Sequence, residues 1–287
     1  MPAHTSTARD RARYTGETLD TARSGIARHR SLGLDECRPE QRAFRVLLAL
    51  GYLNNDPHAY EGPAGWHVSV LSRYTLTMSP RWDRLVIIAS VPDNVTRRLL
   101  RGPMGGSGLP GLRLVEHRGS SGYVLRHLPT GAELVVTGHV SGRAEGPVSE
   151  PNFDALTTAV PVTRAEEEQL RRVPEATEDA QRLIAGVLTR VTARDPHRSW
   201  AIGNWFYDPL TRPGWLDLDH RQHRTLRGRG DHWVLSWGAV PYERDLVAAL
   251  TDPVAGIAGA VRQRDGGHTV ITLGSATLRL RPEVRAS

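Results

Sequence analysis

The chain of 287 residues is long enough for two domains of ordinary size, and its 39% hydrophobic and 24% charged residues are typical of globular proteins. No apolar run approaches the roughly 18 residues of a membrane span, no secretory signal opens the sequence, and the single cysteine, Cys37, excludes an internal disulfide, which together predict a cytoplasmic protein. Lysine is absent, so the 37 basic residues behind the net charge of +6 are all arginines, and P-loop, Schiff-base and kinase chemistry are excluded.

This arginine usage has two interpretations. Arginines can bind the phosphates of DNA or RNA. Arginine in place of lysine, with abundant alanine, glycine and proline, is also typical of a G+C-rich bacterial genome. Charge alone therefore leaves nucleic-acid binding and compositional drift both open.

Residues 1–38 form a basic segment for which we expect a helical hairpin. Residues 8–30 read ARDRARYTGETLDTARSGIARHR. A turn is expected at Thr15-Gly16-Glu17 and a helix cap at Thr18, because a threonine oxygen can accept a free backbone N–H. Leu19, Ala22 and Ile26 would then form the buried stripe of the second helix.

Residues 8–30 resemble the helix–turn–helix part of VapB-type ribbon-helix-helix antitoxins, in which a helix ends at a Thr-Gly-Glu turn. The resemblance implies DNA binding and a regulatory role. That family reads DNA with a β-ribbon ahead of the first helix, whereas Met1–Thr7 contains no alternating strand. The resemblance therefore favours a helical hairpin more than operator recognition, and a generic basic helix pair docked on the first domain is the alternative.

Landmarks recur in the same order along two stretches of the chain. The spacing between Gly65-Trp66 and Val91-Pro92 equals that between Gly214-Trp215 and Val240-Pro241. Other recurring landmarks are Gln41-Arg42 with Gln181-Arg182, Asp56-Pro57 with Asp208-Pro209, and Pro103, Gly108 and Gly111 with Pro253, Gly256 and Gly259. We predict an internal duplication, with repeats at 39–140 and 177–287; the alternative is two unrelated stretches that share common turn residues.

Each repeat is expected to follow the order α-βββ-α-βββ, with a helix packed on an antiparallel sheet. In the first repeat, periodicity predicts helices at 40–50 and 93–100 and strands at 67–71, 74–78, 85–89, 112–116, 123–126 and 133–136. In the second it predicts helices at 180–191 and 243–250, strands at 215–219, 222–226 and 233–237, and hairpin turns at 265–267 and 274–275. The predicted fold class is α+β with tandem duplicated domains.

Buried tryptophans should mark equivalent places in the two copies. We expect Trp66 to pack on the helix stripe Phe44-Leu47-Leu48, and Trp215 to pack on Leu183-Val187-Leu188. His117 and His127 are expected on the solvent face of the first hairpin. Residues 141–176, with four prolines by Pro174 and the acidic run Glu166–Glu168, are expected to be a linker with at most one short helix.

One cluster in the second repeat contains metal-ligand residue types: Asp217, Asp219, His220, His223 and His232. On a strand, however, successive side chains point to opposite faces, so surface residues are favoured over ligands. Cys37 has no neighbouring base to activate it. We therefore assign no catalytic residue, metal or cofactor.

The arginine-rich stretch Arg221–Arg229, flanked by Trp215 and Trp233, is the better candidate for a site. Guanidinium groups bind phosphates in a bidentate geometry, and aromatic rings stack on exposed bases. The predicted nucleic-acid contacts are Arg11, Arg13, Arg23, Arg28, Arg30, Arg221, Arg224, Arg227 and Arg229. In the alternative, the tryptophans belong to the core and the arginines are merely solvated.

The leading hypothesis is a non-enzymatic binding protein that contacts DNA or RNA, with a regulatory or mobile-element role and no membrane partner. A second hypothesis is a protein-interaction module of two similar sheets, which binds a protein partner or forms a homodimer. A third is a metal-dependent hydrolase that uses the run from Asp217 to His223.

Overall fold

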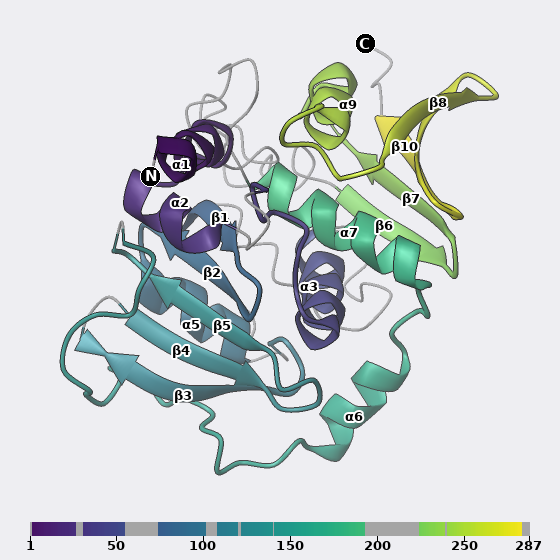
Figure 1. Ribbon diagram of the computed structural model, residues 1–287. Coiled ribbons are helices and arrows are strands. Elements are labelled where there is room, and N and C mark those ends of the chain that lie inside the picture. The colour runs from purple at the N-terminus through teal and green to yellow at the C-terminus, as the bar shows by residue number, and fades with distance from the viewer. Residues whose placement is uncertain are drawn as a thin grey trace, which may run out of the picture.

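The computed structural model describes residues 2–26, 31–54, 74–101, 108–119, 122–139, 141–192, 224–238 and 240–282. Two five-stranded sheets stand on either side of a pair of packed helices (Figure 1). Among the described residues, no helix has the length and apolar character needed to cross a bilayer.

The two repeats have the same order of elements. The first contains α3 (Pro39–Tyr52), β1 (Thr75–Pro80), β2 (Arg84–Ala89), α5 (Pro92–Arg101), β3 (Leu112–Arg118), β4 (Gly122–His127) and β5 (Glu133–Thr137). The second contains α7 (Glu178–Val191), β6 (Arg224–Arg229), β7 (His232–Trp237), α9 (Glu243–Thr251), β8 (Val261–Asp265), β9 (His268–Leu273) and β10 (Ala276–Pro282). The internal duplication is therefore confirmed. The expected strands at 67–71 and 215–219 lie outside the described residues.

Strand order is also the same in the two sheets: β1-β2-β5-β4-β3 in the first and β6-β7-β10-β9-β8 in the second. Three of the four ladders in each sheet are antiparallel, as expected, but β2 pairs with β5 and β7 pairs with β10 in parallel. The parallel pairs arise because a helix follows β2 and β7. That helix returns the chain to the end of the sheet where the strand began, so the next strand, and the third strand after the helix, run in the same direction. The sheets are thus mixed rather than purely antiparallel.

Matching turns show that the duplication extends to individual hydrogen bonds. Gly111 and Gly259 have positive φ values of 76° and 83°, which a glycine adopts without steric cost. Just before them, the N–H of Leu109 donates to Leu99 O (2.7 Å) and the N–H of Ile257 donates to Leu250 O (2.9 Å). Each turn therefore leads from the helix into the edge strand β3 or β8 in the same way.

The helices α3 and α7 pack against each other, so the two repeats share one apolar core (Figure 1). The predicted stripes Phe44-Leu47-Leu48 and Leu183-Val187-Leu188 are both buried, because residues three and four apart lie on one helix face. Trp66 and Trp215 lie outside the described residues. Trp233 and Trp237 are buried in the second repeat instead, so Trp233 belongs to the core and is not available to stack on a base.

The N-terminal segment forms the expected helical hairpin, α1 (Pro2–Thr15) and α2 (Leu19–Gly25). Gly16 has a positive φ of 78°, and the Thr18 hydroxyl accepts a hydrogen bond from the N–H of Thr21, as a helix cap does. Residues 2–7 are helical, so a β-ribbon strand has no counterpart there.

Residues 141–176 contain one short helix, α6 (Arg164–Arg171), whose first turn is closed by Thr163 and Glu166 in a capping box. Hydrogen bonds hold this segment against the first sheet. Both Glu166 carboxylate oxygens accept hydrogen bonds from the buried Arg113 of β3, at 2.8 and 2.7 Å. The linker is thus attached along the first sheet.

Candidate anion-binding site

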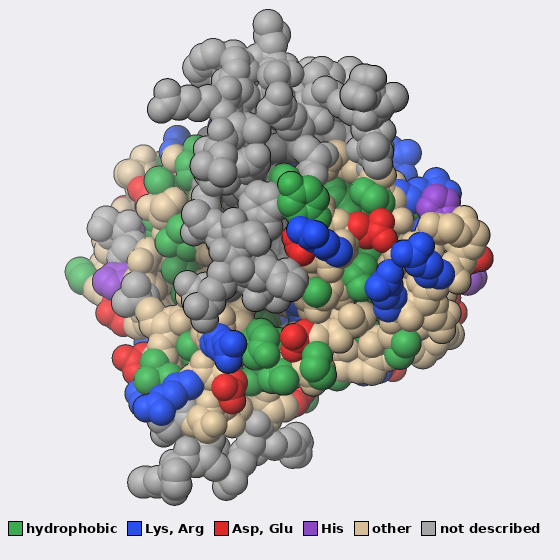
Figure 2. Space-filling model, turned by 90° about the horizontal axis from the view of Figure 1, so that it is seen from above, with side chains coloured by type: hydrophobic (Ala, Val, Ile, Leu, Met, Phe, Trp, Pro, Cys, Tyr) green, Lys and Arg blue, Asp and Glu red, His purple; other side chains and the backbone are tan. Residues whose placement is uncertain are grey.

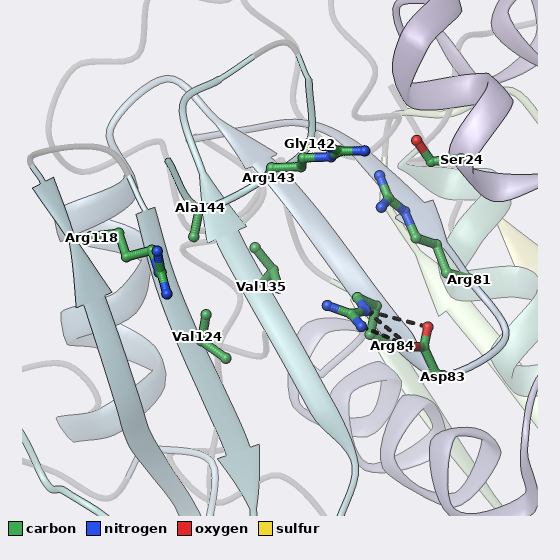
Figure 3. Close-up of a pocket in the computed structure, with 10 residues that line it drawn as sticks. All are labelled: Ser24, Arg81, Asp83, Arg84, Arg118, Val124, Val135, Gly142, Arg143 and Ala144. Carbon is green, nitrogen blue, oxygen red and sulfur yellow. Dashed lines mark hydrogen bonds and ion pairs between the residues drawn. The ribbon is translucent and has the colours of Figure 1, made fainter. Parts of the chain in front are cut away.

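A hollow of about 490 Å³ opens on the outer face of the first sheet, beside α2 (Figure 3). Its floor is apolar and four arginines surround it. The lining residues are Ser24, Arg81, Asp83, Arg84, Arg118, Val124, Val135, Gly142, Arg143 and Ala144. The four arginines give this hollow a markedly cationic rim, whereas the other described cavity has a single arginine, Arg281, in its lining.

Strand alternation places these side chains on the outer face. Along β2, Leu85 and Ile87 point into the shared core, so Arg84 and Val86 point to the opposite face. Val86 lies opposite Val135 of β5 in the sheet register. Together with Ile88 they form a small second apolar cluster, which makes the floor beneath the arginines hydrophobic.

Arg81 is the most unusual member of the set. Its Nε and Nη2 atoms are buried and have no hydrogen-bond partner. Burial lowers the pKa of Arg81, because removal from water disfavours the charged form. Buried guanidinium nitrogen atoms without a hydrogen-bond partner are costly, and an anion that binds them would remove that cost.

The other three arginines differ in how far their charge is neutralised. Arg84 pairs with Asp83 (2.7 Å) and Glu133 (2.8 Å), and the hydrogen bond with Asp83 raises the pKa of Arg84. Arg118 pairs with Glu116 at 2.7 Å. Arg143 is exposed and makes no ion pair with a described residue. Arg81 and Arg143 are therefore the two with charge available for a ligand.

The turn between β1 and β2 holds Arg81 in place through its backbone carbonyls. Arg11 donates to Pro80 O (2.8 Å), and Arg45 donates to Arg81 O (2.6 Å) and Arg84 O (3.3 Å). These donors come from α1 and α3, so two helices far away in sequence position this turn.

Trp82 lies at the tip of the same turn, between the lining residues Arg81 and Asp83, and is 57% exposed. Its carbonyl accepts from the N–H of Arg38 at 3.0 Å, so the backbone is held while the ring faces solvent. A large exposed aromatic next to a cationic hollow is a typical stacking platform. The signal in the sequence was Arg81-Trp-Asp-Arg84 between two apolar strands, and none of these residues was among the predicted contacts.

The structure separates the nine arginines proposed from the sequence. Arg11 and Arg224 are fully buried: Arg11 forms an ion pair with Glu17 at 2.7 Å, and Arg224 donates to Tyr52 O at 2.8 Å. Both belong to the interior and are corrected to structural residues. Arg28, Arg30 and Arg221 lie outside the described residues. The exposed members are Arg13, Arg23, Arg227 and Arg229.

The exposed arginines do not gather in one place. Arg23 pairs with Asp20 at 2.9 Å on the N-terminal hairpin, whereas Arg229 pairs with Glu175 at 3.1 Å on the second sheet. Sequence reasoning therefore found basic residues but not the hollow, whose arginines come from one turn, two strands and a loop.

The expectation that His117 and His127 face solvent is wrong. The exposed fraction of His127 is 0%, and that of His117 is 7%. His127 Nε2 lies 3.1 Å from Pro110 O, which can only accept, so Nε2 carries the proton and Nδ1 accepts from the Thr130 hydroxyl at 2.8 Å. Along β4, alternation places His127 on the same inward face as Tyr123 and Leu125. On β3, a register shift between Leu114 and Glu116 places His117 opposite Tyr123 and therefore on the same face.

Burial of His127 predicts loss of stability in acid. Burial lowers the pKa of His127 to about 4 from its ordinary 6.5. Between these values the unfolded imidazole binds a proton and the folded one does not, so falling pH favours unfolding, by about 3 kcal/mol in total. Urea unfolding at pH 7 and 4.5 should show this loss. His127→Gln should remove most of this difference in stability between pH 7 and 4.5. His232→Gln changes an exposed histidine and should leave the difference unchanged.

Glu166 extends the acid sensitivity to lower pH. Burial alone would raise its pKa, but hydrogen bonds from Arg113, Thr163 and Gly111 lower the pKa of Glu166 to about 2 from its ordinary 4.5. The stability that the Glu166 carboxylate contributes is complete above pH 4.5 and is lost as the pH falls towards 2.

The His127 prediction is tested above that range. Equal acid sensitivity in wild type and His127→Gln between pH 6.5 and 4.5 would contradict the role of His127.

The remaining predicted chemistry has no support in the described structure. Asp217, Asp219, His220 and His223 lie outside the described residues. His232 is exposed, and its Nδ1 lies 3.0 Å from Thr277 Oγ1. The described ranges contain no cluster of three or more side chains suited to hold a metal, and Cys37 is a buried free thiol.

The chain was compared with protein families, curated proteins and solved structures. No protein-family model, no curated protein and no solved structure matches this chain.

Proposed function

We propose that this protein is a non-enzymatic binding protein that takes a single strand of DNA or RNA at the arginine-lined hollow. The observation that carries the proposal is Arg81, a desolvated guanidinium whose Nε and Nη2 atoms have no partner and which borders a cavity with three further arginines. A phosphate matches guanidinium geometry through two parallel hydrogen bonds, and it is the anion that every nucleotide of a single strand carries.

The shape of the site favours a single strand over a duplex. A hollow of about 490 Å³ admits a group the size of a nucleotide, and a double helix cannot enter it. The valine floor suits the apolar surface of a sugar or base, and the exposed Trp82 ring offers a face on which the next base can stack. These features support binding without strong sequence preference.

Fluorescence anisotropy with fluorescein-labelled, mixed-sequence 15-mers tests the proposal, with single-stranded DNA, single-stranded RNA and duplex DNA measured at about 20 mM salt. We expect single strands to bind more tightly than the duplex. Arg81→Gln and Trp82→Ala should each weaken binding by about tenfold, because each removes one phosphate contact or one stacked base. If all four arginines contact phosphates, the plot of log K against log salt should have a slope of about −3, and Arg81→Gln should reduce it by about 0.7.

Arg244→Gln is the matched control. Arg244 is an exposed arginine on α9, in the other repeat, and has no part in the hollow. Its loss should leave binding unchanged. Absence of binding to every oligonucleotide at low salt, or equal loss in Arg81→Gln and Arg244→Gln, would overturn the proposal.

A protein-interaction module remains a second candidate function. The observation that favours it is the exposed edge strand β8, all five residues of which face solvent. Exposed sheet edges pair with extended chains in many complexes.

A further inference from the structure

Within the described residues the two sheets have four edge strands, which differ in what covers them. At β1, the Thr77 hydroxyl donates to Thr15 O of α1 at 2.7 Å. At β6, the backbone of Leu226 exchanges hydrogen bonds of 3.0 and 3.1 Å with the Asn54 side chain. At β3, the linker occupies the edge. Within the part of the chain that the structure describes, no segment pairs with the outer edge of β8.

The first repeat shows what this edge can hold. The N–H of Leu114 donates to Leu156 O (2.7 Å), and Leu114 O accepts from the N–H of Thr158 (3.2 Å). Further along β3, the N–H of Ser149 donates to His117 O (3.0 Å). Linker residues therefore extend the first sheet beyond its edge strand.

Register identifies the equivalent positions in β8. Leu114 lies in one row with Leu125, Leu134 and Leu85, and Arg262 lies in the matching row with Ile271, Leu278 and Trp233. The next inward-facing residue of each edge strand also corresponds. His117 of β3 lies opposite Tyr123, and Arg264 of β8 lies opposite Thr269. Arg262 and Arg264 therefore occupy the places of the two residues whose backbone the linker binds.

Hairpin geometry independently gives the direction of these backbone groups. Asp265 and His268 flank the two-residue turn Gly266-Gly267, so they form a hydrogen-bonded pair. Such pairs alternate along an antiparallel ladder, which leaves Arg262 and Arg264 as non-hydrogen-bonded positions with N–H and C=O directed outward. These are the groups that an added strand would bind.

Side-chain chemistry then indicates the kind of strand. On the first sheet, the inward face beside β3 is covered by linker residue Phe153, whose ring lies 5.9 Å from that of Tyr123. On the second sheet the corresponding inward positions carry the exposed arginines Arg262 and Arg264. Seen from above, basic side chains lie on both sides of the molecule, and several are on the side formed by the second sheet (Figure 2).

The linker itself is acidic. Residues 145–168 contain one arginine, Arg164, and these acidic residues: Glu145, Glu150, Asp154, Glu166, Glu167 and Glu168. One of these acidic residues, Glu166, forms an ion pair with Arg113 of β3 in the first sheet. The chain thus already contains an acidic segment paired with an edge strand that carries arginine.

We infer that β8 is a docking site for an extended acidic peptide of another protein, which pairs with the outward N–H and C=O groups of Arg262 and Arg264 and places its carboxylates against their guanidinium groups. Main-chain hydrogen bonds hold the peptide, and the arginines select its charge. A second copy of this chain fits poorly, because pairing of β8 with β8 places arginines of both chains side by side.

Binding of two labelled eight-residue peptides to the full chain tests this inference. The first peptide is two copies of Glu-Val-Glu-Thr, and the second has glutamine in place of each glutamate. Anisotropy at about 20 mM salt should show binding of the glutamate peptide only. Arg262→Gln with Arg264→Gln should weaken it about tenfold, since two charge-assisted contacts are lost. Arg244→Gln, on α9, is the matched control and should have no effect.

The backbone component has its own readout. Hydrogen exchange of the full chain should show slower exchange of the Arg262 and Arg264 amides when the glutamate peptide is bound. Arg262→Pro removes one outward N–H without removing a bond to β9, so it should abolish binding while the thermal midpoint by circular dichroism shows that the fold is kept. If Arg262→Pro fails to fold, amide exchange in the wild type decides.

Three results would overturn the inference. The first is no binding of the glutamate peptide at about 1 mM, which would leave the two arginines as charges that merely protect an edge from aggregation. The second is binding that does not slow exchange at Arg262 and Arg264. The third is complete displacement of the peptide by a single-stranded oligonucleotide, which would make β8 part of a nucleic-acid surface instead.

Discussion

Glu17→Ala is expected to lower the free energy of unfolding by about 3–5 kcal/mol, because it leaves Arg11 as a buried charge without its carboxylate. Both side chains are completely buried, and Arg11 makes two hydrogen bonds to Glu17, at 2.7 and 2.8 Å. Arg11 also donates to the carbonyls of Gly25, Leu32 and Pro80, so the ion pair joins the N-terminal hairpin to the β1–β2 turn. Urea unfolding followed by circular dichroism measures the loss.

A surface pair on the same hairpin is the control. Arg23 and Asp20 lie 2.9 Å apart, but their side chains are 52% and 80% exposed, so Asp20→Ala should change stability by less than about 1 kcal/mol. Replacing both Arg11 and Glu17 with methionine should recover part of the stability lost in Glu17→Ala, since no unpaired charge remains. Equal effects of Glu17→Ala and Asp20→Ala would contradict the buried-pair explanation.

The Glu17 variant also bears on the proposed site. Arg11 holds the carbonyl of Pro80, directly before Arg81 and Trp82, so loosening this contact should loosen the turn that presents both. We expect Glu17→Ala to weaken binding of a single-stranded oligonucleotide without removing any residue of the hollow.

Leu48→Ala is expected to cost about 2–5 kcal/mol and to destabilise both repeats together, because it leaves a cavity in their shared core. Leu48 is completely buried on α3, and the apolar cluster that contains it extends into α7, β7 and α9. Hydrogen exchange should therefore show amides of β2 and β7 losing protection by the same free energy.

Leu76→Ala, at an exposed leucine of β1 (44%), is the control and should have a small effect. The result against a shared core would be β7 amides that keep wild-type protection in Leu48→Ala while β2 amides lose it. That result would instead support two repeats that unfold independently.

Local patterns in the sequence determined most of the secondary structure and the duplication. Helical spacing identified α3 and α7, Thr-Gly-Glu identified the turn of the N-terminal hairpin, and ordered landmarks identified the two repeats. The shared strand order of the two sheets came from the structure. These predictions succeeded because caps, turns and amphipathic faces depend on residues a few positions apart.

Only the tertiary structure decided which charged residues are available at the surface. Arg11, Arg224 and Arg81 look alike in sequence, yet the first two are satisfied inside the protein and the third has buried nitrogen atoms without a partner. The same holds for edge strands: β3 and β8 occupy equivalent places, and among the described residues only β3 is paired with a linker, which meets it through contacts distant in sequence. Burial and pairing of a polar group depend on which distant segments pack against it, and no local pattern specifies that packing.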